Sequence, residues 1–587
     1  MRKGVAVSPG IAVGTAYCID EIFVDHDAKK LAENEVGAEL SLYEAARDRA
    51  AAELRAMEEK VTSQVGEEAG RIFAVHASIL RDPAFTKKIR NWIVEDRNTA
   101  AAALQRLLSE YASLFARTKD EFLRERFADI RDVVMRLGTH VSQVLKPEST
   151  TLTGPLIVVT DELLPSQAVT LGNVDVRGIV TQTGSQTSHA AIIARSRGIP
   201  AVCGLRGVLK HVKTGDTVVV DGREGVVLVN PPPETLSAYR KLEREFFHLR
   251  DQLATNRDQP AVTRDGVPLE LLANINNVAD AKAACAMGAT GIGLFRTEYL
   301  YLTHPTVPDE DEQFEAYRDI IAASPGHSVT IRTLDIGGDK TVPYLGHTHQ
   351  EANPFLGWRS IRLSFEHPEF FMVQLRAVLR AAACAREMGG EVRLMVPMVT
   401  VVEEIQKVRR MVRKATQSLE HEGKPHASVP LGMMLEVPAA AVSIRSMLRS
   451  VDFVSIGSND LIQYLMAADR DNAKVSHLCQ PLAPAVLRVL YNVIKACRKA
   501  EKPLTLCGEM AGQPRAFVLL VGMGLRSFSM SPAFLPSMKD LAQHIVAKDA
   551  EAILKRALRF GTTASVKRFM TENLHRIAPN LAMLDTV

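Results

Sequence analysis

Short apolar runs recur along the second half of the chain, and each is followed by residues with helical spacing. Strands that alternate with helices are typical of a parallel sheet, and eight such units predict a (β/α)8 TIM-like barrel over residues 261–587. The predicted strands are Leu271–Ile275, Gly291–Leu294, Ser328–Leu334, Val392–Val396, Leu431–Leu435, Phe453–Ile456, Leu504–Leu506 and Ser527–Met530.

Residues 28–145 follow a different pattern, rich in Ala, Glu, Arg and Leu and almost free of proline. This pattern predicts an all-helical subdomain. Such a block could be a docking surface for a partner protein or an ordinary helical bundle without one. Its clearest apolar stripe consists of Phe122, Phe127, Ile130, Val133, Val134 and Leu137.

Valine-rich runs on both sides of this block predict strands. They lie within Val5–Cys18, Gly154–Val159, Val174–Thr181 and Asp216–Val229. We therefore expect a small α/β domain built from residues 1–27 and 146–230, with the helical subdomain inserted into it. A triple proline and a charged helical pattern predict a helical linker over residues 231–260. The fold class is multidomain α/β.

Composition narrows the class of protein. Of the 587 residues, 46% are hydrophobic and 24% charged, and the net charge is +3, which gives no support for bulk binding of nucleic acid or for a polybasic membrane anchor. The seven scattered cysteines form no CxxC pair, which favours a reducing cytoplasm. No signal peptide or membrane-spanning run is predicted.

His189 stands where a polar turn, Thr183–Ser188, leads into a helical pattern over Ala190–Arg195. The first amides of a helix favour a bound anion, and a neutral imidazole is a nucleophile, so His189 is a candidate phosphoryl acceptor. The same residue could simply cap the helix.

Polar residues follow the predicted barrel strands, at the edge where such barrels carry their reactive groups. Arginines suit phosphate and carboxylate, and paired carboxylates suit Mg²⁺, so the set predicts a site for a small phosphorylated acid. Its members are Asn276, Arg296, Arg332, Asp335, Glu436, Asn459, Asp460, Cys507 and Glu509.

Each of these residues also has a purely structural interpretation. Arg296 and Glu298 could form a surface ion pair, and Arg332 and Asp335 a buried one. Cys507 could be a small buried hydrophobic residue. Convergence from separate strands favours the functional interpretation.

Over its whole length the chain resembles Enzyme I, the phosphoenolpyruvate–protein phosphotransferase family of the bacterial sugar phosphotransferase system. The resemblance rests on five long motifs: Gly291–Leu300 (GIGLFRTEYL), Arg332–Lys340 (RTLDIGGDK), Asn353–Arg362 (NPFLGWRSIR), Ser455–Arg470 (SIGSNDLIQYLMAADR) and Leu506–Gly512 (LCGEMAG).

The resemblance implies a role for each matching residue. His189 is similar to the phosphorylated histidine, and Cys507 to the proton donor that converts the enolate into pyruvate. Substrate contacts are implied for Arg296, Arg332, Asn459, Asp460 and Arg470, and Mg²⁺ ligation for Glu436 and Asp460. It also implies docking of the phosphocarrier protein HPr on the helical subdomain, a homodimer through the barrel, and a swivelling histidine domain.

One position departs from the family pattern, which usually has arginine where this chain has Gln186. Gln186 has no guanidinium charge to neutralise the phosphorylated histidine. Two alternative classes fit the same motifs. One is an enzyme of the pyruvate phosphate dikinase or phosphoenolpyruvate synthase type, which would need an ATP-binding domain not found in the sequence, and the other is a regulatory, nitrogen-type phosphorelay protein.

Overall fold

The computed structural model describes residues 2–8, 10–19, 30–65, 67–116, 130–141, 154–163, 175–183, 194, 198–254, 256–302, 307–337, 351, 353–470, 472 and 474–581. The chain forms two compact units, Met1–Glu243 and Arg244–Val587. Each unit has its own buried cores, and each is described separately below. No helix among the described residues has the length and apolarity that a membrane span requires.

The first unit contains an eight-stranded sheet with the order β1-β8-β7-β3-β4-β5-β6-β2. The four central strands β3, β4, β5 and β6 pair in parallel, each with the next. The strands β1, β8, β7 and β2 join the sheet through antiparallel pairs. β4 and β5 are buried because their valine and isoleucine side chains face cores on both sides of the sheet. The strands are β1 (Arg2–Lys3), β2 (Val5–Ser8), β3 (Ile11–Cys18), β4 (Leu156–Thr160), β5 (Val176–Thr181), β6 (Ala201–Cys203), β7 (Thr217–Asp221) and β8 (Val226–Val229).

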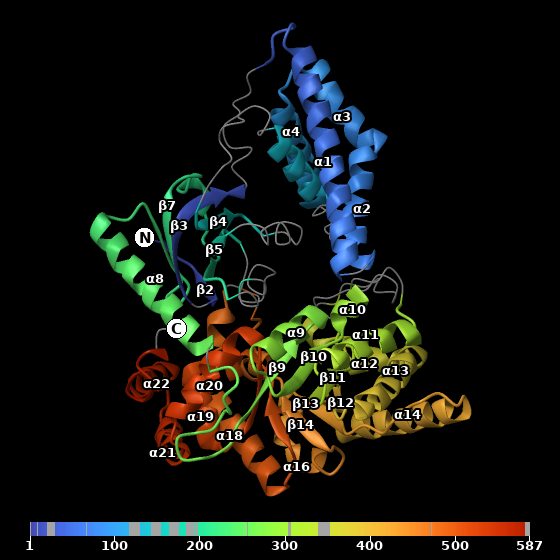
Figure 1. Cartoon of the computed structure of the whole chain (residues 1–587), viewed down its shortest axis with the longest axis vertical. Helices are drawn as coiled ribbons and strands as arrows, with labels where there is room; N and C mark the ends of the chain where they lie inside the picture. Colours follow the sequence, from blue (N-terminus) through green and yellow to red (C-terminus); the bar gives the residue numbers. More distant parts are fainter. Residues whose placement is uncertain are drawn as a thin grey trace. The chain divides into compact units, whose positions relative to one another are not determined.

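A helical bundle lies between β3 and β4 in the sequence, as predicted (Figure 1). Val133, Val134 and Leu137 of the predicted stripe are buried in its core, with Tyr43 and Ile93. Phe122 and Phe127 lie outside the described residues. The helices are α1 (Val36–Val65), α2 (Glu67–Arg81), α3 (Pro83–Val94), α4 (Ala100–Ala116) and a helical segment at 130–141.

Helix α8 (Pro233–Ala254) follows β8. Its Glu243 carboxylate accepts a hydrogen bond of 2.8 Å from the amide of Val13 in β3. The helix therefore begins as part of the first unit.

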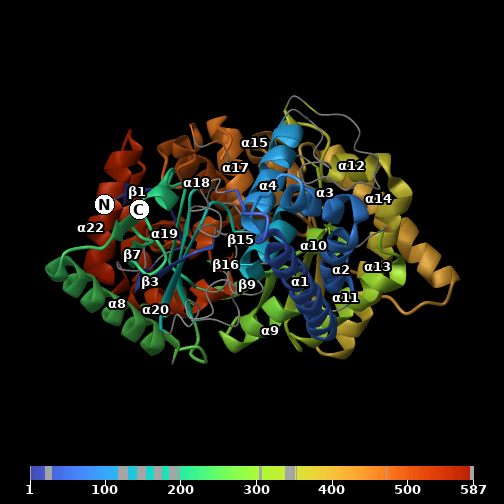
Figure 2. The same ribbon diagram turned by 90° about the horizontal axis from the view of Figure 1, so that it is seen from above.

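The second unit is a closed barrel of eight parallel strands, β9 to β16, and all eight predicted strands are present. In Figure 2 helices α9, α13, α17 and α20 lie on different sides of the strands. The strands are β9 (Glu270–Ile275), β10 (Gly291–Arg296), β11 (Ser328–Arg332), β12 (Glu391–Val396), β13 (Leu431–Leu435), β14 (Phe453–Ile456), β15 (Leu504–Leu506) and β16 (Ser527–Met530).

Helices cover the outside of the barrel, and their apolar faces complete the largest core of the protein. They are α9 (Val278–Ala286), α10 (Glu298–Leu302), α11 (Glu310–Ala322), α12 (Ile361–Glu366), α13 (Pro368–Glu387), α14 (Val402–His421), α15 (Pro438–Val442), α16 (Ile444–Met447), α17 (Ser458–Met466), α18 (Pro484–Lys499), α19 (Pro514–Met523), α20 (Leu535–His544), α21 (Ala547–Ala557) and α22 (Thr563–Ile577).

Strand β10 carries one extra residue relative to β11. Ile292 pairs with Val329, but Phe295 pairs with Ile331, so the register shifts between them. The same shift occurs against β9. This bulge makes Arg296 the register partner of Arg332.

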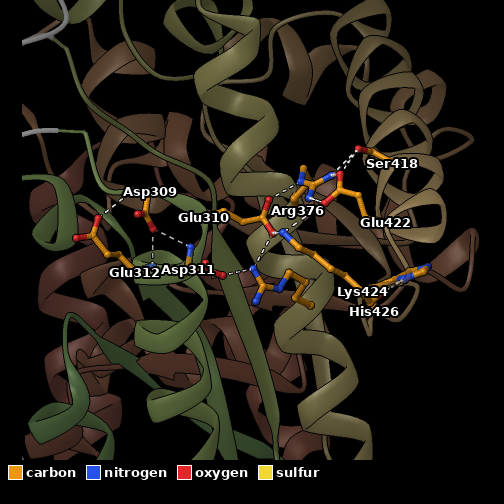
Figure 3. A network of polar contacts seen from close by, with 10 residues as sticks. Asp309, Glu310, Asp311, Glu312, Arg376, Ser418, Glu422, Lys424 and His426 are labelled. Carbon is orange, nitrogen blue, oxygen red and sulfur yellow. Dashed lines mark hydrogen bonds and ion pairs between the residues drawn. The ribbon is translucent and has the colours of Figure 1, made fainter.

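A network of charged side chains joins α11, α13 and the end of α14 on the outside of the barrel (Figure 3). Arg376 of α13 donates to Glu310 at the start of α11 and to both carboxylate oxygens of Glu422, at 2.7 and 2.6 Å. Arg380 and Lys424 also contact Glu310, at 2.6 and 3.2 Å. Hydrogen bonds from Arg376 come first among the effects that lower the pKa of Glu422 to about 2.

Candidate active site

The carboxyl ends of the barrel strands bring the predicted charged residues to one edge. Arg296 and Arg332 end β10 and β11, Glu436 directly follows β13, and Cys507 directly follows β15. The strand register places Glu436 and Cys507 at the same height along the barrel axis, because the residues before them, Leu435 and Leu506, both pair with Ile456. In barrels of this kind the reactive groups lie at this edge.

Arg332 is a buried cation with two buried carboxylate partners. Its guanidinium lies 3.0 Å from Glu298 and 3.2 Å from Asp335, and only 6% of the residue is exposed. Burial opposes the charge, but the carboxylates of Glu298 and Asp335 outweigh it and raise the pKa of Arg332. The guanidinium therefore stays charged where it is shielded from water.

Arg296 lies beside Arg332 but has no carboxylate of its own. It forms no ion pair or hydrogen bond with any residue that the structure describes. Glu298, which could have been its surface partner, is instead buried against Arg332. Burial, and then the positive charge of Arg332, lower the pKa of Arg296. Two adjacent guanidiniums, one of them uncompensated, form a binding position for an anion.

Glu436 is fully buried, and one of its two carboxylate oxygens is hydrogen-bonded to the backbone. Oε1 accepts a hydrogen bond of 2.6 Å from the amide of Met398, whereas Oε2 accepts none from the residues that the structure describes. Burial, followed by the carboxylates of Asp460 and Asp335, raises the pKa of Glu436 to about 8. Gly457 makes room for this carboxylate, because a Cβ there would lie 2.8 Å from Oε2. A buried oxygen without a donor, next to a second carboxylate, fits a metal ion.

Arg359 joins the two acidic groups of the edge. It donates to Asp335 at 3.0 and 3.1 Å and lies 3.6 Å from the Asp460 carboxylate. It also donates to the Tyr464 hydroxyl at 3.2 Å. Burial lowers the pKa of Arg359, but Asp335 and Asp460 outweigh that effect, so the pKa is raised overall.

Arg359 was not among the predicted site residues, although it lies inside one of the five motifs. It stands 27 residues after the end of β11, in a segment without strand or helix periodicity. Its only sequence signal is an arginine next to Trp358 within the motif Asn353–Arg362.

Asn459 lies in the first turn of α17, and Arg470 lies four residues after its last residue, Met466. The Asn459 side-chain oxygen accepts a hydrogen bond of 3.1 Å from the amide of Glu509, which ties α17 to the segment after β15. Arg470 lies 3.7 Å from Asp460. Gly508 allows the segment after β15 to approach the start of α17, since a Cβ on it would come within 1.8 Å of the Ser458 hydroxyl.

Cys507 is 2% exposed and packs with Leu294, Met395, Met434 and Phe453. Its thiol donates to the carbonyl of Ile456 at 3.5 Å. Burial is the largest effect on this thiol and raises its pKa, so it stays protonated at neutral pH.

Asn276 and His189 were also predicted to contribute to the site. Asn276 directly follows β9 at this edge, where its side chain donates to Asp280 at 3.0 Å, while Asn274 donates to the carbonyl of Cys507 at 2.8 Å. His189 and Gln186 lie outside the described residues.

A barrel edge with paired arginines, paired carboxylates and a protonated thiol defines an enzyme that acts on a small phosphorylated acid. The sequence comparisons agree with this class. Residues 250–547 match the family of PEP-utilising enzymes (PEP, phosphoenolpyruvate) in its PEP-binding domain, residues 3–126 match the N-terminal domain, and residues 152–225 match the mobile domain.

Full-length relatives narrow the class to one family. The chain is 40% identical over 569 residues to the phosphoenolpyruvate-protein phosphotransferase of Bacillus sp. (strain S), with 97% of each chain covered. It is 39% identical to that of Geobacillus stearothermophilus, again over 97% of each, and 36% identical to that of Haemophilus influenzae, over 98% and 99%. The chain belongs to the phosphoenolpyruvate–protein phosphotransferase family. Its reaction is phosphoryl transfer from phosphoenolpyruvate to protein, and membership implies a divalent metal.

Proposed function

We propose that the chain transfers the phosphoryl group of phosphoenolpyruvate to its own His189, and then to a histidine of the carrier protein HPr, as the first step of a sugar phosphotransferase system. The observation that carries the donor half is the pair Arg296 and Arg332, of which Arg296 has no anionic partner among the described residues. A phosphate group would supply that partner.

In the first step the phosphate binds between the two arginines, with Asn459 and Arg470 as further contacts and Asp460 held by Arg359 and Arg470. The His189 ring nitrogen forms a bond to phosphorus as the bond to the enolate oxygen breaks. Positioning and neutralisation of charge by fixed arginines supply most of the rate enhancement in such transfers.

Glu436 and Asp460 would hold the divalent metal, which we propose is Mg²⁺. The free Oε2 of Glu436 and its proximity to Asp460 support this ligand pair. Two carboxylates leave the remaining positions to phosphate oxygens and water, as Mg²⁺ prefers. When bound, the ion supplies positive charge to the phosphate.

Cys507 would protonate the product. The enolate released by the transfer carries its electron pair to C3, and the thiol proton moves to that carbon to give pyruvate and a thiolate. A raised pKa keeps the proton available on this buried thiol, which supports the role of general acid.

We propose four functional parts: a phosphohistidine domain (residues 1–27 and 146–230), a helical HPr-docking subdomain (28–145), a helical linker (231–260) and a barrel that binds phosphoenolpyruvate and forms a homodimer (261–587). His189 must reach both the barrel edge and the carrier, so its domain would swivel, with residues 231–233 as one proposed hinge; the other predicted hinge, near 145–153, lies outside the described residues. Thr187, Ser188 and helix amides would replace the charge that Gln186 lacks. The cytoplasm is the proposed location.

The test of the acceptor is direct. The purified chain is incubated with Mg²⁺ and phosphoenolpyruvate labelled in its phosphate, and acid-labile label on protein is measured. We expect His189→Ala to abolish the label, while a surface histidine variant, His327→Ala, takes up label as the parent does. Normal labelling of His189→Ala would show that another residue is the acceptor.

A further inference from the structure

A second charged cavity lies in the barrel unit, away from the candidate active site. Its volume is about 430 Å³, which is within the range of pockets that hold small ligands. It is formed by the last turn of α18, the turn between α19 and β16, and α21. Its polar lining consists of Arg498, Arg526, Lys548, Lys555, Glu551 and Tyr491.

This cavity lies at the amino-terminal face of the barrel. Arg526 directly precedes β16, whereas the arginines of the candidate active site end β10 and β11. All eight strands are parallel, so the two sets of cations lie at opposite ends of the strands. A ligand bound here would not be the substrate of the phosphoryl transfer.

The cations of the cavity are poorly compensated. The single lining carboxylate, Glu551, is paired with Lys555 at 2.7 Å. Arg498, Arg526 and Lys548 have no ion pair with any residue in the described part of the chain. Asp265, whose charge partly offsets the lowering of the Arg526 pKa, also accepts from the Ala547 amide at 2.9 Å and the Thr263 hydroxyl at 2.7 Å.

The Arg526 guanidinium is held by the backbone before any ligand binds, and the Arg498 guanidinium lies next to Gly524. Nη1 of Arg526 donates to the carbonyls of Val521 and Leu525 at 3.0 and 2.8 Å, which leaves its other nitrogens available. The Arg498 guanidinium lies over Gly524, where a Cβ would come within 2.2 Å of Nη1. Gly524 also has a φ of 92°, a conformation that favours glycine.

Burial, and then the charge of Arg498, lower the pKa of Arg526. The two cations therefore lie close enough to repel each other. Bringing like charges together without an anion is unfavourable, and phosphate groups are the anions that fixed guanidiniums bind bidentately.

We propose that this cavity is a second ligand site, which binds a small molecule carrying two linked phosphate groups. Four cationic side chains and one carboxylate leave a net charge of +3, more than a single phosphate offsets. Tyr491 offers a ring at one wall for the organic part of the ligand.

The test uses the full chain and inorganic pyrophosphate as the probe, without Mg²⁺ and with a chelator present. Binding is measured by isothermal titration calorimetry at low ionic strength. We expect Arg498→Gln to weaken pyrophosphate binding at least about tenfold, since a charged hydrogen-bonding group is lost. Orthophosphate should bind the parent chain more weakly than pyrophosphate.

Two variants make the result specific. Lys499→Gln removes a charge from an exposed neighbour in α18 that does not line the cavity, and it should bind pyrophosphate as the parent does. Arg296→Gln separates this site from the candidate active site and should also retain binding. The proposal is overturned if Arg498→Gln binds normally, if Lys499→Gln loses as much affinity, or if an oligonucleotide binds through Arg498 while pyrophosphate does not.

Discussion

At the scale of single residues, Cys507 and Cys497 form a natural comparison. Both thiols are buried, at 2% and 0% exposure, and burial raises the pKa of each, that of Cys497 to about 12. Only Cys507 follows a barrel strand at the edge with the arginines, whereas Cys497 lies in the outer helix α18. The two residues therefore share a packing role, and only one has a position suited to chemistry.

We predict that Cys507→Ala slows pyruvate formation about 10²- to 10⁴-fold, the usual contribution of a general acid, while phosphoenolpyruvate still binds. Because the pKa of Cys507 is raised, the donating thiol persists as pH rises, and the parent rate should fall only above about pH 8.5, the ordinary value for cysteine. Single-turnover pyruvate formation between pH 7 and 10 measures the slower rate of the variant and the pH dependence of the parent. Cys497→Ala is the control; equal rates in the two variants would leave Cys507 a packing residue only.

The sequence allowed much of the edge to be predicted at this scale, because a residue directly after a buried strand has little freedom in where it lies. Arg296, Arg332, Glu436 and Cys507 were placed by that argument. Arg359 was not, because its contacts with Asp335 and Asp460 come from a loop whose path no periodicity specifies. Asn276 also directly follows a strand, and its side chain donates to Asp280 there.

At the scale of elements, the apolar runs predicted all eight barrel strands, since a strand covered on both faces must be continuously hydrophobic. The two-residue β1 and three-residue β6 were missed, whereas β15, which is as short as β6, was predicted because it continues the strand-then-helix repeat of the barrel. The extra residue in β10 was also missed, because a bulge depends on the pairing partner.

The network around Arg376 links three outer helices and gives a prediction about stability. Arg376→Ala removes charged hydrogen bonds to Glu310 and Glu422 and should cost about 1.5–3 kcal/mol in the barrel's free energy of unfolding, measured in urea at pH 7. Arg318→Ala is the control, since Arg318 pairs only with its exposed neighbour Asp319 among the described residues.

This destabilisation should depend on pH with a definite sign. The pKa of Glu422 is about 2 in the folded chain and 4.5 without these contacts, so its stabilising effect is present above the higher value and is lost as pH falls towards the lower. Parent and Arg376→Ala should therefore converge in stability between about pH 5 and pH 2. A constant difference over that interval would exclude the ion pair as the cause.

At the scale of the whole molecule, every hydrophobic cluster falls within one of the two compact units. Units with separate cores unfold separately unless a large interface couples them. We predict at least two transitions in scanning calorimetry of the full chain.

Ligand binding should identify the barrel transition. With His189→Ala to prevent turnover, phosphoenolpyruvate and Mg²⁺ should raise the midpoint of one transition only, by mass action on the folded barrel. Adding either component alone serves as the control. One cooperative transition that shifts as a whole would contradict the independence of the units.

The bulge in β10 decides which of its residues stands opposite Arg332. If β10 paired regularly from Ile292 onward, Phe295 would stand opposite Arg332, and an aromatic ring would take the place of the second guanidinium. Gly293 lies inside the shifted segment and has no room for a side chain, because a Cβ would lie 2.5 Å from the Ser529 hydroxyl. Removing one residue from the shifted segment would straighten the strand and leave Arg296 opposite Arg332, whereas a β10 of the same length without the bulge would not align the two arginines. The register shift, and not the presence of two arginines alone, therefore decides whether two guanidiniums meet at this edge.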